Sequence, residues 1–161
     1  DVNGHVNSIM NSKIIDADVI EIMKVYNQAF MEMAYMEMTK GQNATLKKWA
    51  SDILASKKTE NIALSKMKEK LTSANLHDDS FYEDVNRFLQ DSLFLPETST
   101  LPVDKQFAIL LAPHHRRAID VGRLYLKHST NAELKAFTQM WIKEYEQDIM
   151  RIKPIDEGIK L

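Results

Sequence analysis

The sequence of 161 residues contains no cysteine and only four glycines and four prolines. Without cysteine the chain has no disulfide bond, no thiolate metal site and no cysteine nucleophile. The scarcity of glycine and proline, beside many Leu, Lys, Glu, Met and Ala residues, favours helices over other secondary structure. The predicted fold class is therefore all-α.

Neither sign of charge dominates, since the formal net charge is only −2. This balance provides no basic face for nucleic acid and no polybasic anchor for anionic lipid. No apolar run approaches the length needed for a transmembrane segment. With 44% hydrophobic and 27% charged residues, the composition is that of a globular protein, and residues 1–161 are expected to form a single domain.

Motifs of common enzyme classes are missing as well. The sequence has no Gly-x-Ser-x-Gly nucleophile motif and no glycine-rich dinucleotide or phosphate loop. A ferritin-type di-iron centre needs an acidic residue three positions before a histidine on two helices, and none of the five histidines has one. We therefore expect a protein that is not an enzyme.

Apolar residues recur at helical spacing in four long segments and one short one. The predicted helices run from Asp16 to about Thr39, from a cap at Asn43 to about Leu71, from about Asp78 to Leu93, from about Asp104 past Tyr125, and from Thr130 to Pro154. The stretch Thr130-Asn131-Ala132-Glu133 is typical of a capping box. Pro113 is expected to kink or restart its helix, and Pro154 to end the last one.

The second half of the sequence repeats the first at an offset of 88 residues. Asp16 then aligns with Asp104, and Asn43-Ala44-x-Leu46-Lys47 aligns with Asn131-Ala132-x-Leu134-Lys135. Two duplicated helical hairpins bury their apolar stripes against each other. We therefore predict an antiparallel four-helix bundle with repeats at about 16–72 and 104–160, and a linker at 73–103 that carries a short crossover helix.

Four polar side chains form the candidate site: His114, His115, Asp148 and Glu60. At about 100° per residue, His114 faces the core and His115 lies at its edge, while Asp148 and its repeat partner Glu60 also point inward. Asp120 points outward. Because an unpaired buried charge is costly, the inward groups must either satisfy one another or hold a metal ion.

These alternatives lead to two hypotheses about function. In the first, the His/carboxylate set binds copper or zinc weakly, with affinity lost as imidazole takes up protons below about pH 6.5. In the second, the same groups pair with Lys57 and the Tyr145 hydroxyl, and only specify packing in a structural or interaction module. Proton-transfer chemistry is a third reading, and self-association is compatible with each.

The segment Asp104-x-x-Phe107…Pro113-His114-His115-x-x-Ala118-Ile119-Asp120-x-Gly122 resembles the signature of the bacterial domain-of-unknown-function family 305. Leu134-x-x-Phe137…Trp141-Ile142…Asp148-Ile149 is similar to the following helix of that family. The resemblance implies a ferritin-like bundle, export to the periplasm and, for some members, copper handling through histidine and methionine. Removal of an export signal would explain why the chain starts at Asp1; a cleaved tag is the alternative.

The chain departs from the family at three positions where methionine is typical: Leu111, Val121 and Ile152. Thioethers suit Cu(I), so these replacements weaken the expectation of a copper site at the motif. Four of the nine methionines do cluster, at Met31, Met33, Met36 and Met38. Since they scatter around their helix, with Met36 outward, we interpret them as adaptable core filler. The expectation is an exported bundle with weak or vestigial metal binding.

Overall fold

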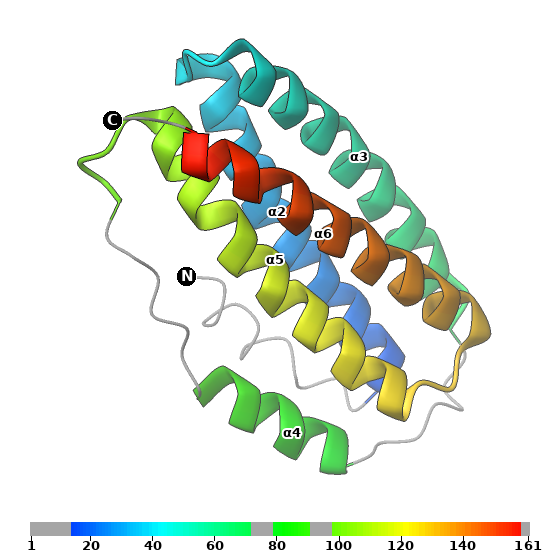
Figure 1. Cartoon of the computed structure of the whole chain (residues 1–161). Helices are drawn as coiled ribbons and strands as arrows, with labels where there is room; N and C mark the ends of the chain where they lie inside the picture. Colours follow the sequence, from blue (N-terminus) through cyan, green and yellow to red (C-terminus); the bar gives the residue numbers. More distant parts are fainter. Residues whose placement is uncertain (1–13, 72–78, 91–97, 159–161) are drawn as a thin grey trace.

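The computed structural model describes residues 14–71, 79–90 and 98–158. This part of the chain contains helices and connecting turns but no strand, so the all-α prediction is confirmed. The helices are α2 (Ile15–Lys40), α3 (Ala44–Glu69), α4 (Asp79–Gln90), α5 (Val103–His128) and α6 (Ala132–Gly158). Figure 1 shows the four long helices side by side, with the shorter α4 outside them.

The bundle is assembled from two helical hairpins. Helix α2 packs along α3, α5 packs along α6, and α2 against α5 joins the two pairs (Figure 1). The Asp16 carboxylate at the start of α2 accepts a hydrogen bond from the Tyr125 hydroxyl near the end of α5. At the opposite end, the Asp104 carboxylate accepts one from the Gln42 amide, so α2 and α5 run antiparallel. The ferritin-like relationship remains a prediction.

An asparagine caps the N-terminus of the second helix in each hairpin, Asn43 before α3 and Asn131 before α6. The Asn43 Oδ1 atom accepts hydrogen bonds from the amides of Thr45 and Leu46, at 3.0 and 3.1 Å, and Asn131 Oδ1 accepts one from Leu134 at 2.9 Å. The predicted capping box at Thr130 is therefore wrong. The helix begins one residue later than that box requires, and the Thr130 hydroxyl lies 3.4 Å from Asp16.

Helix boundaries follow the offset seen in the sequence. The ends of α2, at Ile15 and Lys40, and those of α5, at Val103 and His128, both differ by 88 residues. The first residues of α3 and α6 differ by the same number. A constant offset between corresponding helix ends is expected if one hairpin is a duplicate of the other. Duplication remains our interpretation of this offset.

Both internal prolines are tolerated within helices. Helix α5 continues through Pro113 without a restart, and α6 continues through Pro154 to Gly158, so the predicted stop is wrong. A proline removes one backbone hydrogen bond, to the carbonyl four residues earlier. For Pro154 that carbonyl belongs to Met150, whose side chain is 75% exposed, so water can satisfy it.

Large aromatic and aliphatic side chains fill the space between the four long helices. Those with almost no exposed surface include Trp141, Tyr26, Tyr125, Tyr145, Phe30, Leu46, Leu64 and Leu111. Gly122 allows α5 and α6 to approach closely, because a Cβ atom there would lie 3.0 Å from the Ile142 side chain.

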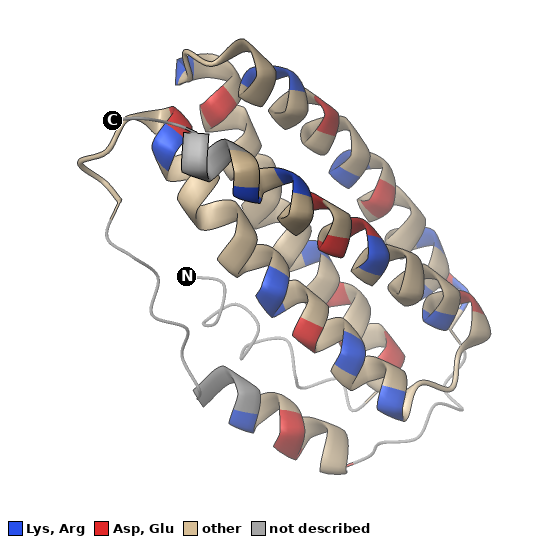
Figure 2. Cartoon of the chain, in the orientation of Figure 1, with Lys and Arg blue, Asp and Glu red and all other residues tan. Residues whose placement is uncertain are grey.

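Charges of both signs are interspersed along the helices in Figure 2. Most of these side chains face solvent, but a few, among them Lys57, Glu60 and Glu37, are buried in the bundle. None of the described helices combines the length and apolar character required to cross a bilayer.

Candidate functional site

The histidine in the core is His115. Its side chain is 1% exposed, whereas His114 is only partly buried, which reverses the predicted orientation of the pair. The buried stripe of α5 follows a three-four spacing: Ala108, Leu111, His115, Ala118, Gly122 and Tyr125. Helical periodicity predicts an apolar face of α5 but places His114 on it instead of His115, while Phe107, at 3% exposure, is buried beside this stripe.

Polar and aromatic groups enclose the His115 ring. Its Nε2 atom lies 3.2 Å from Asp148 Oδ2 on α6. The ring centroid is 4.5 Å from that of Phe30 and 4.4 Å from that of Tyr145. Burial lowers the pKa of His115 below its ordinary value even though Asp148 opposes this shift. The ring is therefore neutral near pH 7 and acts as a packing element with one polar contact.

Glu60 lies beside a cation of its own helix. The Lys57 ammonium is 2.7 Å from Glu60 Oε1, and these side chains are 4% and 8% exposed. The Ser56 hydroxyl lies 3.2 Å from the same oxygen. Lys57 Nζ also sits 4.3 Å above the centroid of the Tyr145 ring. The predicted assistance of Lys57 is thus present, while Tyr145 contributes its ring to this pair rather than its hydroxyl.

Asn27, which is fully buried on α2, was not predicted as a site residue. Its Oδ1 atom accepts hydrogen bonds from the Tyr145 hydroxyl at 3.0 Å and from Trp141 Nε1 at 3.4 Å. Its Nδ2 atom donates to Asn61 on α3 at 2.9 Å. The offset of 88 residues equates Asn27 with His115. The repeat therefore contained a signal for this residue: each copy places one polar side chain at the same inward position.

The core groups are arranged as pairs rather than around a common centre. Among the residues that the structure describes, no three histidine or acidic side chains are placed to share a metal ion. A cleft open to solvent reaches Asp148, but Lys57 and Arg151 also line it, and Arg151 Nη1 lies 3.9 Å from Asp148 Oδ1. Asp52 and Glu144 line the cleft as well, so both signs of charge surround Asp148, and His115 and Arg151 already contact its carboxylate.

His114 lies on the outer side of the α2–α5 contact. Its ring meets the Phe30 ring edge-on, with centroids 6.4 Å apart. In the described part of the chain its ring nitrogens make no hydrogen bond or ion pair. Burial, followed by the charges of His115 and Arg117, lowers the pKa of His114. A neutral imidazole with an available lone pair therefore sits near the surface.

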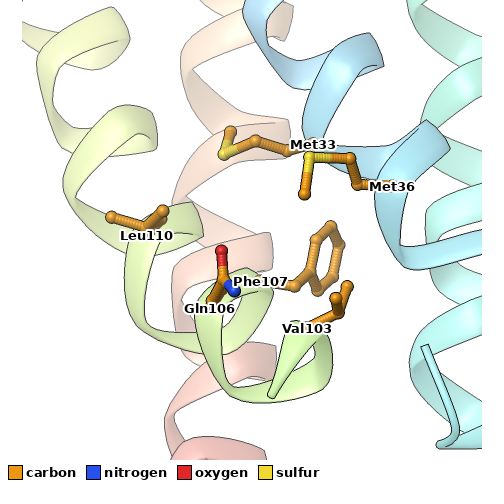
Figure 3. A pocket seen from close by; sticks show the side chains of 6 residues that line it. All are labelled: Met33, Met36, Val103, Gln106, Phe107 and Leu110. Atoms are coloured by element: carbon orange, nitrogen blue, oxygen red, sulfur yellow. The ribbon is translucent and has the colours of Figure 1, made fainter. Parts of the chain in front are cut away.

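A small pocket lies on the same face, between α2 and α5. Its lining residues are Met33, Met36, Val103, Gln106, Phe107 and Leu110. Figure 3 shows the Met33 and Met36 side chains extending over this pocket, with Met33 directed toward Leu110. From the sequence these methionines were interpreted as core filler, because the four in this segment scatter around the helix; the expected outward position of Met36 is confirmed by its 41% exposure.

The pocket adjoins His114. Leu110 is one turn before His114 on α5, and Phe30, which contacts His114, is one turn before Met33 on α2. The Met33 side chain and the His114 ring are therefore separated by about one helical turn, or about 5 Å along this face. Met36 lies a further turn away from His114.

No protein-family model and no curated protein sequence matches the chain. Solved structures do match it. CopM in the Ag-bound form aligns with a TM-score of 0.68 and 18% identity over 89% of this chain and 95% of that chain. CopM in the Cu(I)-bound form gives a TM-score of 0.64 and 18% identity over 89% and 96% of the two chains, and the Cu(II)-bound form gives 0.68 and 16% over the same shares. The TM-scores show that this chain shares the helical-bundle fold of these structures, and at such low identity the likeness extends to the fold alone.

Proposed function

We propose that this protein is an exported bundle that binds a soft monovalent metal ion, Cu(I) or Ag(I), on its α2–α5 face. The Met33 thioether and the His114 imidazole are the ligands. The observation that carries the proposal is a neutral, partly exposed histidine with no hydrogen-bond partner among the described residues, one turn from a methionine that borders a pocket. Thioether sulfur and imidazole nitrogen together suit soft ions.

The structural neighbours support the choice of metal. The aligned CopM structures hold Ag, Cu(I) or Cu(II) in a bundle of the same fold. Export is carried over from the resemblance to family 305, whose members are commonly exported.

The remaining residues of the predicted site support this function less well. His115, Asp148 and Glu60 already have partners, and the Lys57 ammonium stands among them. Zinc or Cu(II) would have to displace these contacts and overcome the nearby positive charge. Of the four residues predicted from the sequence, only His114 remains a ligand in this proposal.

Calorimetric titration with Ag(I), and with Cu(I) under reducing conditions against a competing chelator, tests the proposal. Wild type is expected to bind one equivalent saturably. His114→Ala and Met33→Leu each remove a ligand and should weaken binding by about tenfold or more, equivalent to about 1.4 kcal/mol. Met150→Leu, at an exposed methionine on α6, is the matched control and should bind as wild type does.

The pH profile of binding adds a second criterion. Because the pKa of His114 is lowered, its imidazole remains neutral at pH values where an ordinary histidine is protonated. Affinity should therefore persist below about pH 6.5, the ordinary histidine pKa. Absence of saturable binding by wild type, or equal binding by all three variants, would contradict the proposal.

The paired core favours one alternative, a structural or interaction module in which polar groups only specify packing. His115, Asp148, Lys57 and Glu60 satisfy much of one another's bonding capacity without a metal. A wild-type protein that takes up neither ion, yet loses stability when these pairs are broken, would support this alternative.

A further inference from the structure

Glu37, in the last turn of α2, is a completely buried acid with 0% exposure. If the carboxyl group is ionised and can only accept, neither of its oxygens receives a hydrogen bond from the described part of the chain. The side chain folds over Gly41, where a Cβ atom would collide with the carboxyl group. An ionised carboxylate in this position would be buried without a donor and close to the negative end of the helix dipole.

The acid that approaches Glu37 is Asp104, at the start of α5. The Asp104 carboxylate accepts hydrogen bonds from the backbone amides of Gln42 and Asn43, each at 3.0 Å. These bonds attach the turn between α2 and α3 to the second hairpin. The Glu37 carboxyl lies within hydrogen-bonding reach of the same Asp104 side chain.

The two acids can be in contact if one of them carries a proton. Asp104 has amide donors that stabilise its charge, whereas Glu37 has none, so the proton belongs on Glu37 and its hydroxyl donates to Asp104. Burial, followed by the hydrogen bond and charge of Asp104, raises the pKa of Glu37 to about 8. For Asp104 burial acts in the opposite direction, but the bonds from Asn43, Glu37 and Gln42 lower its pKa.

The other end of the bundle provides an internal comparison. There the Tyr125 hydroxyl donates to Asp16 at 2.6 Å. An offset of 88 residues equates Asp16 with Asp104 and Glu37 with Tyr125. Glu37 therefore occupies the position of a hydroxyl donor, and a protonated carboxyl group supplies such a hydroxyl.

We propose that Glu37 and Asp104 share one proton and form a pH-dependent clasp that holds the α2–α3 turn on the start of α5. Lys47 from α3 and Asp104 from α5 are the charged groups that act on Glu37. Loss of the proton places two carboxylates in contact and weakens the clasp. The inference is independent of metal binding, since neither acid is a proposed ligand.

The direction of the pH effect follows from proton linkage. When the clasp opens, Glu37 returns to its ordinary pKa of 4.5, so the open form releases a proton that the closed form keeps. Stabilisation by the clasp is complete below that value and is lost as pH rises through about 8. Between these limits the opening constant should rise about tenfold per pH unit, and above them it should level off.

Hydrogen exchange at the Gln42 and Asn43 amides measures this opening. After correction for base catalysis, their protection factors in wild type should fall about tenfold per pH unit between about pH 5 and 8. In Glu37→Gln the side-chain amide donates to Asp104 without a titratable proton, so this dependence should disappear. Glu32→Gln, at an exposed acid on the same helix, is the control and should retain the wild-type profile.

A carbon NMR titration of the Glu37 carboxyl group in wild type tests the shared proton without a variant. The signal should be that of a carboxylic acid at pH 7. An ionised Glu37 at pH 7 would overturn the proposal even if Glu37→Gln failed to fold. A steep pH dependence of Gln42 and Asn43 protection that persisted in Glu37→Gln would overturn it too.

Discussion

Ionisable side chains meet in the middle of the bundle in pairs, His115 with Asp148 and Lys57 with Glu60. The inward positions of Asp148 and Glu60 could be predicted from the sequence, because helical periodicity shows which residues share a face. The choice between His114 and His115 could not, because adjacent residues are separated by about 100° around a helix and both were expected at or beside the apolar face. Which of them is buried depends on how α5 packs against α2 and α6, and these contacts join residues far apart in the sequence.

His115→Ala should lower the free energy of unfolding by about 2–4 kcal/mol, because it removes a buried ring and its 3.2 Å contact with Asp148. The lost contacts include the rings of Phe30 and Tyr145. Urea unfolding at pH 7.5 measures the difference. His114→Ala is the matched control and should cost clearly less, since that ring is only partly buried and makes no hydrogen bond to the part of the chain that the structure describes. Equal losses in the two variants would disagree with the assignment of His115 to the core.

At the level of helices, the predicted segments correspond closely to the observed ones. The boundaries of α2 and the start of α5 were predicted within one residue, because apolar spacing and breaks such as Gly41 are local signals. The stop predicted at Pro154 was wrong, since a proline alone does not end a helix when water or a neighbouring group satisfies the freed carbonyl. The Met33 pocket was also missed, because it forms only where two distant helices meet.

Asn43→Ala and Asn131→Ala should each destabilise the protein by about 1 kcal/mol, since each removes a side-chain acceptor from the first turn of a helix. Thermal or urea unfolding measures the loss. Asn86→Ala, at an exposed position inside α4, is the control and should show no such loss. If Asn131→Ala were as stable as wild type and Thr130→Ala were destabilised instead, the result would support the capping box predicted at Thr130 from the sequence.

Over the whole molecule, contacts with the bundle also hold α4, the helix in the connection between the two hairpins. Helix α4 buries Phe81 and Val85 completely, and the Tyr82 hydroxyl donates to Asp18 on α2 at 2.6 Å. The Asp16–Tyr125 and Glu37–Asp104 pairs lie at opposite ends of the α2–α5 contact. The hairpins are thus joined at both ends as well as along their apolar faces.

The separation of these contacts along the chain has a kinetic consequence. A three-residue turn links α2 to α3, whereas the Tyr125 hydroxyl and Asp16 are 109 residues apart, so each hairpin closes a short loop and their docking closes a long one. We expect the hairpins to form before they dock. Tyr125→Phe, which removes a docking contact, should accelerate unfolding and leave the folding rate nearly unchanged in stopped-flow experiments. Slower folding in this variant would show that the docking contact is already formed in the transition state, which would contradict late docking. With late docking, the long crossover is the last loop that the chain closes.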